Sequence, residues 1–117
     1  PEKMPLIKID FGLMEQVIKN LFQNALIYTQ EDSKIEVQAS YDDKFGYIMI
    51  SDNGKGIPDK DVQNIFDKFY RVNNKIAGGT GLGLSISKGI VEAMKGTISV
   101  ENKNSGGLKF TIKLPLN

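Results

Sequence analysis

Two pairs of short stretches, each pair joined by a turn, most constrain what this chain can fold into. Residues 35–40 alternate apolar and polar side chains, the period of a half-buried strand, and residues 47–51 follow across a short turn. Residues 97–101 and 108–114 form a second pair, around a turn with two glycines. Hairpins in both halves of the chain favour a mixed, largely antiparallel sheet over a doubly wound parallel one.

Three further stretches have the spacing of helices. Apolar side chains recur every three or four positions in residues 11–28, and shorter helical patterns occupy residues 59–69 and 82–94. A short strand is expected at residues 6–9. The sequence therefore predicts an α+β fold, a two-layer α/β sandwich with a mixed, mostly antiparallel sheet and the helices on one face.

Length and composition exclude several classes of protein. The 117 residues are enough for one domain with one core, which we expect to be residues 1–117. Lys and Arg number 15 and Asp and Glu 14, so the net charge of +1 gives no electrostatic reason to expect a nucleic acid partner. There is no cysteine, and no apolar run approaches the roughly 18 residues of a membrane span. Because the first residue is Pro1, we expect a segment of a longer protein.

Two asparagines lie on the edge of the apolar stripe predicted for the helix 11–28. Asn20 and Asn24 are one turn apart, and Tyr28 follows one turn later. An amide beside a core needs partners, because leaving it unpaired costs about 1–3 kcal/mol. Two amide oxygens at this spacing could hold Mg²⁺, which prefers oxygen ligands. Taken alone, hydrogen bonds from both amides to neighbouring backbone are the better explanation.

An acid and two glycines follow the predicted strand 47–51, in the segment 52–58 (DNGKGIP). Gly54 and Gly56 let the backbone approach a ligand closely, while Asp52 can accept a hydrogen bond from a donor such as the amino group of a purine. Asp-Asn-Gly is also common turn chemistry. Taken alone, an ordinary strand-to-helix turn is the more frequent explanation.

A glycine-rich run, residues 78–85 (GGTGLGLS), ends a loop and opens the helix 82–94. Alternating glycines expose successive backbone N–H groups, and the helix N-terminus adds partial positive charge, so the run suits phosphates. It lacks the Gly-Lys-Ser/Thr of a P-loop, and a loop precedes it where a dinucleotide fingerprint requires a strand. Arg71 and Lys75 lie in the loop 71–81, where they could meet phosphates or remain in water. A flexible hinge is the competing explanation for the glycines.

Together these blocks are specific in their order and spacing. Residues 20–25 (NLFQNA) resemble the N box of histidine kinases, residues 52–57 (DNGKGI) the G1 box, residues 65–71 (IFDKFYR) the F box and residues 79–84 (GTGLGL) the G2 box. The resemblance extends over essentially all 117 residues and implies the Bergerat fold, which histidine kinases share with gyrase, Hsp90 and MutL. Within the sensor kinases, several segments look most like the potassium-responsive KdpD type.

Carried over position by position, the resemblance implies a site for ATP and Mg²⁺. Asn24, helped by Asn20, would hold Mg²⁺ at the triphosphate, and Asp52 would accept hydrogen bonds from the adenine amino group. Residues 79–83 would hold the phosphates, and residues 69–79 would form a lid. The ATP-binding residues implied in this way are Asn20, Asn24, Tyr28, Asp52, Gly54, Gly56, Ile57, Phe69, Arg71, Lys75, Gly79, Thr80, Gly81, Leu82, Gly83 and Leu84.

One position departs from the family pattern. Kinases of this type usually carry a lysine three residues after the second asparagine, where it touches a phosphate, and this chain has Ile27. We therefore expect weaker ATP binding, or a substitute cation at Lys75, Arg71 or Lys55, or a domain that has begun to degenerate.

Two absences separate the kinases from the ATPases that resemble this chain. In the ATPases a glutamate occupies the position of Asn20 and activates water, whereas an amide has no useful basicity near neutral pH. The chain also contains no histidine, so a phosphoacceptor histidine has to come from another domain. We expect the ATP-binding half of a protein histidine kinase. A nucleotide-binding module without transfer activity and an anti-sigma-type serine kinase are the alternatives.

The resemblance also implies partners and a place in the cell. The chain would bind ATP and release ADP, and it would present the γ-phosphate to its own dimerisation and histidine-phosphotransfer domain. A response regulator would act downstream of the parent protein. The chain would be the cytoplasmic domain of a membrane-anchored bacterial sensor kinase, soluble and monomeric by itself, with no nucleic acid partner.

Overall fold

The computed structural model describes residues 11–28, 34–54, 56–67, 71–72, 75–76, 83–104 and 106–116, with the backbone alone for residue 11 and residues 24–28, 71–72 and 75–76. The expected strand at residues 6–9 lies outside these ranges. The helices and strands are α1 (Phe11–Tyr28), β1 (Ile35–Tyr41), β2 (Phe45–Asp52), α2 (Asp59–Val62), β3 (Arg71–Val72), β4 (Lys75–Ile76), α3 (Gly83–Ala93), β5 (Thr97–Asn102) and β6 (Leu108–Pro115).

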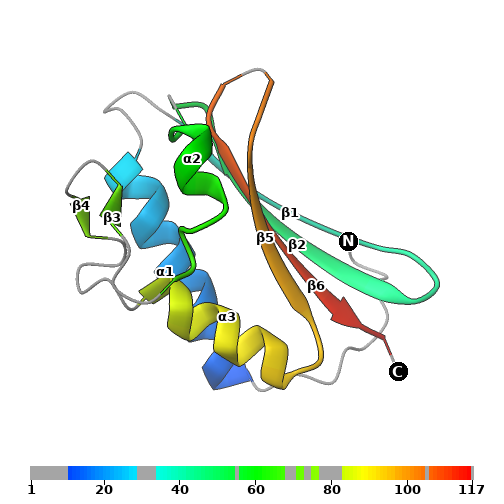
Figure 1. The fold of residues 1–117 in the computed structure, drawn as a ribbon. Coiled ribbons are helices and arrows are strands. Elements are labelled where there is room, and N and C mark those ends of the chain that lie inside the picture. The colour runs from blue at the N-terminus through cyan, green and yellow to red at the C-terminus, as the bar shows by residue number, and fades with distance from the viewer. Residues whose placement is uncertain are drawn as a thin grey trace.

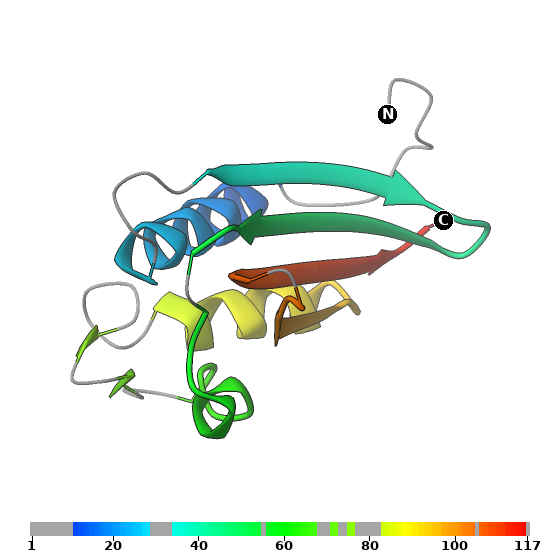
Figure 2. The ribbon, with the colours of Figure 1, turned by 90° about the horizontal axis from the view of Figure 1, so that it is seen from above.

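The main sheet has the strand order β1-β2-β6-β5, and every pair in it is antiparallel. Both expected hairpins are present. α1 precedes the first hairpin, α2 and α3 lie between the two hairpins, and the helices cover one face of the sheet (Figures 1 and 2). The predicted α+β two-layer architecture is therefore confirmed. In the part of the chain that the structure describes, no helix has the length and apolarity to cross a membrane.

The core lies between this sheet and the helices α1 and α3. Alternate residues of β6 are buried, from Leu108 through Phe110 and Ile112 to Leu114, as the strand period requires. The two helices contribute the buried side chains of Met14, Val17, Leu21, Leu84 and Val91. Burial of this apolar area supplies most of the stabilisation of the layer contact.

The edge strand β1 extends beyond the helices. Val37 lies opposite Ile50 in the ladder, so both side chains are on the same face of the sheet. Ile50 is buried, whereas Val37 remains 49% exposed and Tyr41, further along β1, 42% exposed. The helices therefore cover mainly β2, β6 and β5.

The helix α2 is shorter than predicted, because a side chain competes with its backbone. The expected helix at residues 59–69 ends at Val62. The side-chain amide of Asn64 donates to the carbonyl of Lys60 over 3.2 Å, which is the acceptor that the N–H of residue 64 would use in a continuing α-helix. That N–H donates to Asp61 instead, over 3.0 Å, and the chain continues as turns.

The segment 71–81, expected to be a loop, contains a small hairpin. The strands β3 and β4 pair antiparallel, with Arg71 opposite Ile76 and Val72 opposite Lys75. Two-residue strands give no periodicity that could be read from a sequence, which explains why the segment has the pattern of a loop.

The helix α3 ends in a Schellman motif. The N–H of Gly96 donates to the carbonyl of Val91 over 3.0 Å, and the N–H of Lys95 donates to that of Glu92 over 2.9 Å. Lys95 takes the left-handed conformation, with φ of 65°. A Cβ on Gly96 would overlap the carbonyl oxygen of Lys113, so the end of α3 lies directly on β6.

This packing predicts opposite effects for two glycine substitutions, one within α3 and one just after it. We expect Gly96→Ala to lower the free energy of unfolding by about 1–3 kcal/mol, because its Cβ overlaps the backbone of β6. Gly89→Ala is the matched control, since its Cβ would contact nothing, and it should stabilise by about 0.5–1 kcal/mol. Urea unfolding followed by circular dichroism measures both. A Gly96→Ala variant as stable as the parent would contradict the contact.

Candidate functional site

At one end of the sheet, two positions that face the helices are taken by polar side chains. Asp52 ends β2 two residues after the buried Ile50, and Asn102 ends β5 two residues after the partly buried Val100. Successive side chains of a strand alternate between faces, so both polar groups lie on the helix-covered face. Leu108 begins β6 between them and pairs with Asn102 in the ladder.

The carboxylate of Asp52 is buried and is held by backbone N–H groups. Its residue is only 3% exposed. The oxygen Oδ1 accepts hydrogen bonds from the N–H of Gly54 over 2.9 Å and from that of Leu108 over 3.3 Å. Among the described residues, no hydrogen bond reaches Oδ2. A buried carboxylate fixed at one oxygen can use the other to accept a hydrogen bond from a ligand.

Gly107 makes room for this arrangement. It has φ of 92°, and a Cβ on it would overlap the carbonyl oxygen of Asp52 and lie 2.8 Å from Oδ1 of the same residue. Only a glycine can take this conformation and approach the strand so closely. The turn between β5 and β6 therefore sets where the N–H of Leu108 meets the carboxylate.

Asn20, one of the two asparagines predicted to hold Mg²⁺, contacts the start of α3. The side-chain amide of Asn20 donates to the carbonyl of Gly83 and to the hydroxyl of Ser87, both over 3.2 Å. Ser87 is fully buried and donates in turn to the carbonyl of Gly83 over 2.9 Å. The amide nitrogen of Asn20 thus links α1 to α3.

The phosphate-binding role expected of the first turn of α3 remains a prediction. The first N–H groups of α3 have no partners within the helix, as at any helix start. Gly83 and Leu84 are buried, and the side chain of Leu84 packs in the core. These two residues can therefore serve a phosphate only through their backbone. Ile57 likewise belongs to the core and is 7% exposed, so only a small part of its side chain can reach a ligand.

Several predicted site residues lie outside what the structure describes. The side chains of Asn24, Tyr28, Arg71 and Lys75 are not described, and neither is any atom of Phe69 or of residues 79–82. Their predicted roles remain predictions. Within the described ranges, no group of three or more acidic side chains lies together as a candidate metal site.

Three residues of this region are not among those predicted from the sequence: Asn102, Gly107 and Ser87. Asn102 gives one usable signal, because it continues the core-facing phase of Ile98 and Val100 with a polar residue. The pair Gly106-Gly107 marks a turn, but nothing in the sequence places it against Asp52. The bond between Asn20 and Ser87 joins residues far apart in the chain, and no local pattern reports it.

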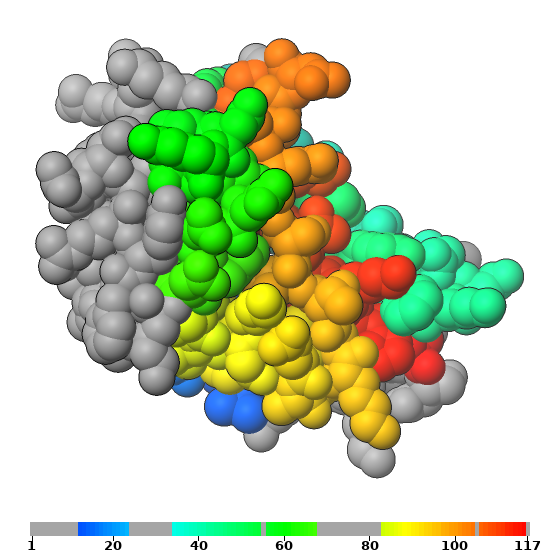
Figure 3. All heavy atoms as spheres, in the orientation of Figure 1, coloured from blue at the N-terminus to red at the C-terminus, as the bar shows by residue number. Residues whose placement is uncertain are grey.

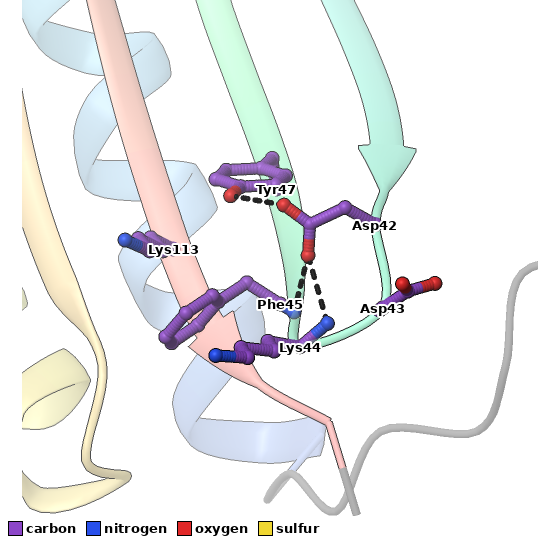
Figure 4. Close-up of a pocket in the computed structure, with 6 residues that line it drawn as sticks. All are labelled: Asp42, Asp43, Lys44, Phe45, Tyr47 and Lys113. Carbon is purple, nitrogen blue, oxygen red and sulfur yellow. Dashed lines mark hydrogen bonds between the residues drawn. The ribbon is translucent and has the colours of Figure 1, made fainter.

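A small cleft of about 150 Å³ lies beside Asp52, and Lys34, Asn53 and Lys103 contribute to its lining. This is below the roughly 300–1,000 Å³ of most small-molecule pockets. A larger cleft, about 440 Å³, lies at the opposite end of β2, around Asp42 and Tyr47 (Figure 4). None of the predicted ATP-binding residues lines it, and we do not assign ATP to it.

The larger cleft contains a tightly bonded turn. Oδ1 of Asp42 accepts hydrogen bonds from the N–H groups of Lys44 and Phe45 over 2.9 and 2.8 Å, and Oδ2 accepts one from the Tyr47 hydroxyl over 2.8 Å. These bonds, that from Lys44 first, hold the pKa of Asp42 below its ordinary value of 3.8. The bond to Asp42 raises the pKa of Tyr47 above its ordinary 10.0. Nearby, the ammonium of Lys113 lies 4.0 Å from the ring centroid of Phe45.

The chain belongs to the family of histidine kinase-, DNA gyrase B- and HSP90-like ATPases, whose family model matches residues 10–117. The family expected from the four sequence blocks is thereby confirmed.

Individual relatives are sensor proteins by name. CiaH, a sensor protein of Streptococcus pneumoniae, is 43% identical over 113 residues, which are 94% of this chain and 26% of CiaH. KdpD, a sensor protein of Clostridium acetobutylicum, is 41% identical over 118 residues, which are 98% of this chain and 13% of KdpD. The chain therefore spans about a quarter or less of the length of these relatives.

A solved structure agrees with the fold. Full-length ShkA in complex with AMPPNP superposes with a TM-score of 0.82 at 28% sequence identity, over 97% of this chain and 23% of the ShkA chain.

The turn at Asp42 gives a pH-dependent prediction. In Asp42→Asn the pKa of Tyr47 should fall toward 10.0, because the bond from the phenol to a charged acceptor is lost. Nuclear magnetic resonance of the tyrosine rings across a pH titration measures this, and Asp43→Asn, which changes the neighbouring charge, is the control. An unchanged Tyr47 titration in Asp42→Asn would contradict the bond.

The two shifts also fix the pH range of their effect on stability. The pKa of Asp42 is lowered on folding, so its contribution is present above 3.8 and is lost as the pH falls through the folded pKa. The pKa of Tyr47 is raised on folding, so its contribution is present below 10.0 and is lost as the pH rises through the folded pKa.

Proposed function

We propose that this chain binds ATP with Mg²⁺ and presents the γ-phosphate to a histidine on a separate dimerisation domain, as the catalytic part of a sensor histidine kinase. Membership of the family, the names of the relatives and the AMPPNP bound to ShkA support this proposal. The single observation that carries it is the buried carboxylate of Asp52, held at one oxygen by two backbone N–H groups.

This carboxylate suits the recognition of adenine. An ionised carboxyl group is an acceptor only, so it favours a purine with an amino group at position 6 over one with a keto oxygen. Oδ1 is already engaged, so the second oxygen is the one offered to the ligand. Because water is largely excluded from a residue that is 3% exposed, a mismatched purine would leave a buried acceptor unpaired.

The phosphates would meet α3 and the loop before it. The N–H groups in the first turn of α3 suit anionic oxygens, and the glycines at residues 79, 81 and 83 extend this backbone surface. Mg²⁺, when bound, would neutralise part of the phosphate charge. Asn24, helped by Asn20, would hold it.

The residues favour phosphoryl transfer over hydrolysis. Asn20 stands where a water-activating glutamate would be required, and its amide nitrogen is bonded to Gly83 and Ser87. An amide in this position can link helices, but it cannot take a proton from water. The chain contains no histidine, so the acceptor belongs to another domain. What this chain contributes is positioning and charge neutralisation, the dominant effects in phosphoryl transfer.

For the parent protein we propose a membrane-anchored bacterial sensor with this domain in the cytoplasm and a response regulator downstream. Residues 5–10, 66–71 and 88–93 favour the potassium-responsive KdpD type. Over the chain as a whole, CiaH and KdpD are almost equally similar, at 43% and 41% identity, so overall similarity does not separate the two types.

The proposal predicts a change of purine preference in Asp52→Asn. The side-chain oxygen of the new amide can keep the bonds from Gly54 and Leu108, which turns its NH₂ group toward the ligand. We expect affinity for ATP to fall roughly 10- to 100-fold, while inosine triphosphate, which has a keto oxygen at position 6, binds better than ATP. Isothermal titration calorimetry measures both nucleotides.

Two further variants serve as controls for this experiment. Asp43→Asn removes a charge at the far end of the sheet and should bind both nucleotides like the unsubstituted chain. Asn24→Ala should remove the Mg²⁺ dependence of binding while keeping the preference for ATP over inosine triphosphate. If Asp52→Asn keeps the ATP affinity of the unsubstituted chain and its preference for ATP over inosine triphosphate, the assignment of Asp52 to adenine is wrong.

A nucleotide-binding module without transfer activity is the second candidate, and Ile27 favours it. A cation that touches a phosphate in related kinases is missing at this position. The parent protein incubated with γ-labelled ATP should incorporate acid-labile label on histidine if the kinase proposal is correct. Binding of ATP without any labelled histidine would establish the module instead, and Ile27→Lys would then be expected to restore affinity.

A further inference from the structure

The side chain of Asn102 binds both backbone groups of Ile57. Its oxygen accepts a hydrogen bond from the N–H of Ile57 over 3.0 Å, and its NH₂ group donates to the carbonyl of Ile57 over 2.8 Å. The amide therefore bonds to Ile57 as the backbone of a neighbouring strand residue would, with one accepted and one donated hydrogen bond. The two residues are 45 positions apart in the chain.

A third bond extends this contact to α2. The same NH₂ group donates to the side chain of Asp59, the first residue of α2, over 3.1 Å. In the space-filling view, the segment around α2 (green) lies against β5 (orange), with which α2 is in contact (Figure 3). One side chain at the end of β5 thus ties down the segment from Ile57 to Asp59.

Asn102 also accounts for a glycine. Gly56 has φ of 75°, and a Cβ on it would overlap the side-chain oxygen of Asn102. The side-chain amide of Asn102 thus occupies the space that a Cβ on residue 56 would need. This contact within the protein explains the glycine without a ligand.

Leu108, at the start of β6, connects Asn102 to Asp52. Leu108 pairs with Asn102 in the ladder between β5 and β6, and the N–H of Leu108 donates to the carboxylate of Asp52. The loop residue Ile57 and the carboxylate are thereby fixed relative to each other through the start of β6. A ligand that touched both would meet a preformed pair of contacts.

We propose that Asn102 is a positioning residue for purine recognition: it holds the backbone at residues 56–57 at a set place relative to the carboxylate of Asp52. This inference rests on the proposed function, because it takes Asp52 as the group that recognises adenine. Asn102 does not itself contact the ligand in this proposal. Its effect is transmitted through Gly56 and Ile57.

A positioning role can be separated from a purely structural one by the ratio of two affinities. A variant that only destabilises the fold reduces the folded fraction, and this weakens every ligand by the same factor. Loss of positioning instead weakens the contacts to the base more than those to the triphosphate. The ratio of ATP affinity to inosine triphosphate affinity should therefore fall.

The test measures both nucleotides by calorimetry on the full chain with Asn102→Ala. We expect ATP affinity to fall about tenfold and inosine triphosphate affinity to change much less. Asn104→Ala is the matched control, because Asn104 lies in the turn that follows Asn102 and is exposed. This variant should bind both nucleotides like the unsubstituted chain. If Asn102→Ala does not fold, Asn102→Asp keeps the shape but loses the two donated bonds, and the same fall in the ratio is expected.

A double substitution tests the link to Gly56. In the otherwise unsubstituted chain, Gly56→Ala should weaken ATP binding strongly, because the new Cβ meets the amide of Asn102. In the Asn102→Ala background that amide is gone, so the same substitution should weaken ATP binding less. The combined loss in affinity should therefore be smaller than the product of the two separate losses.

The outcomes distinguish this inference from the proposed function. If the unsubstituted chain binds ATP and prefers it to inosine triphosphate, but the Asn102 variants keep both affinity and preference, the positioning role is overturned and the proposed function stands. A loss of ATP affinity in the double variant equal to the product of the two single losses would also overturn the positioning role. If the unsubstituted chain binds no ATP, the proposed function fails and the inference fails with it.

Discussion

The arrangement at one end of the sheet depends on a buried carboxylate. Removing the charge of Asp52 from water is unfavourable unless hydrogen bonds replace the lost hydration, and Gly54 and Leu108 supply them from two segments of backbone. Leu108 can reach the carboxylate because Gly107 has no side chain. The turn between β5 and β6, which contains no predicted ligand-binding residue, therefore fixes the acid proposed to recognise the ligand.

The same end of the sheet shows how one scaffold positions several loops. The strands β2, β6 and β5 end or begin together there, and a polar side chain replaces an apolar one where the core gives way to the site. Asp52 and Asn102 occupy these positions on the outer two of the three strands. On the helical side, Asn20 joins α1 to the start of α3. Side chains on rigid elements thus hold the backbone of the loops, and the loops remain available to a ligand.

The sequence predicted the elements better than their contacts. Periodicity located the two hairpins and the long helices, because each signal is contained in one segment. It failed for α2, where the amide of Asn64 takes a backbone acceptor, and for the hairpin of β3 and β4, whose strands are too short to show a period. Asp52 was identifiable as an acid at a strand end followed by glycines. The hydrogen bonds between Asn102 and Ile57 could not be identified in this way, because they depend on the register of β5 against β6 and on the path of a distant loop.

The most direct test of the account is a crystal structure of this chain with a non-hydrolysable ATP analogue and Mg²⁺. The distance to measure joins Oδ2 of Asp52 and the exocyclic amino nitrogen of the purine. The account predicts a hydrogen bond of roughly 2.7–3.2 Å, with Oδ1 still bonded to backbone. A purine bound elsewhere, or one whose amino group faces another acceptor while Oδ2 of Asp52 meets only water, would contradict it.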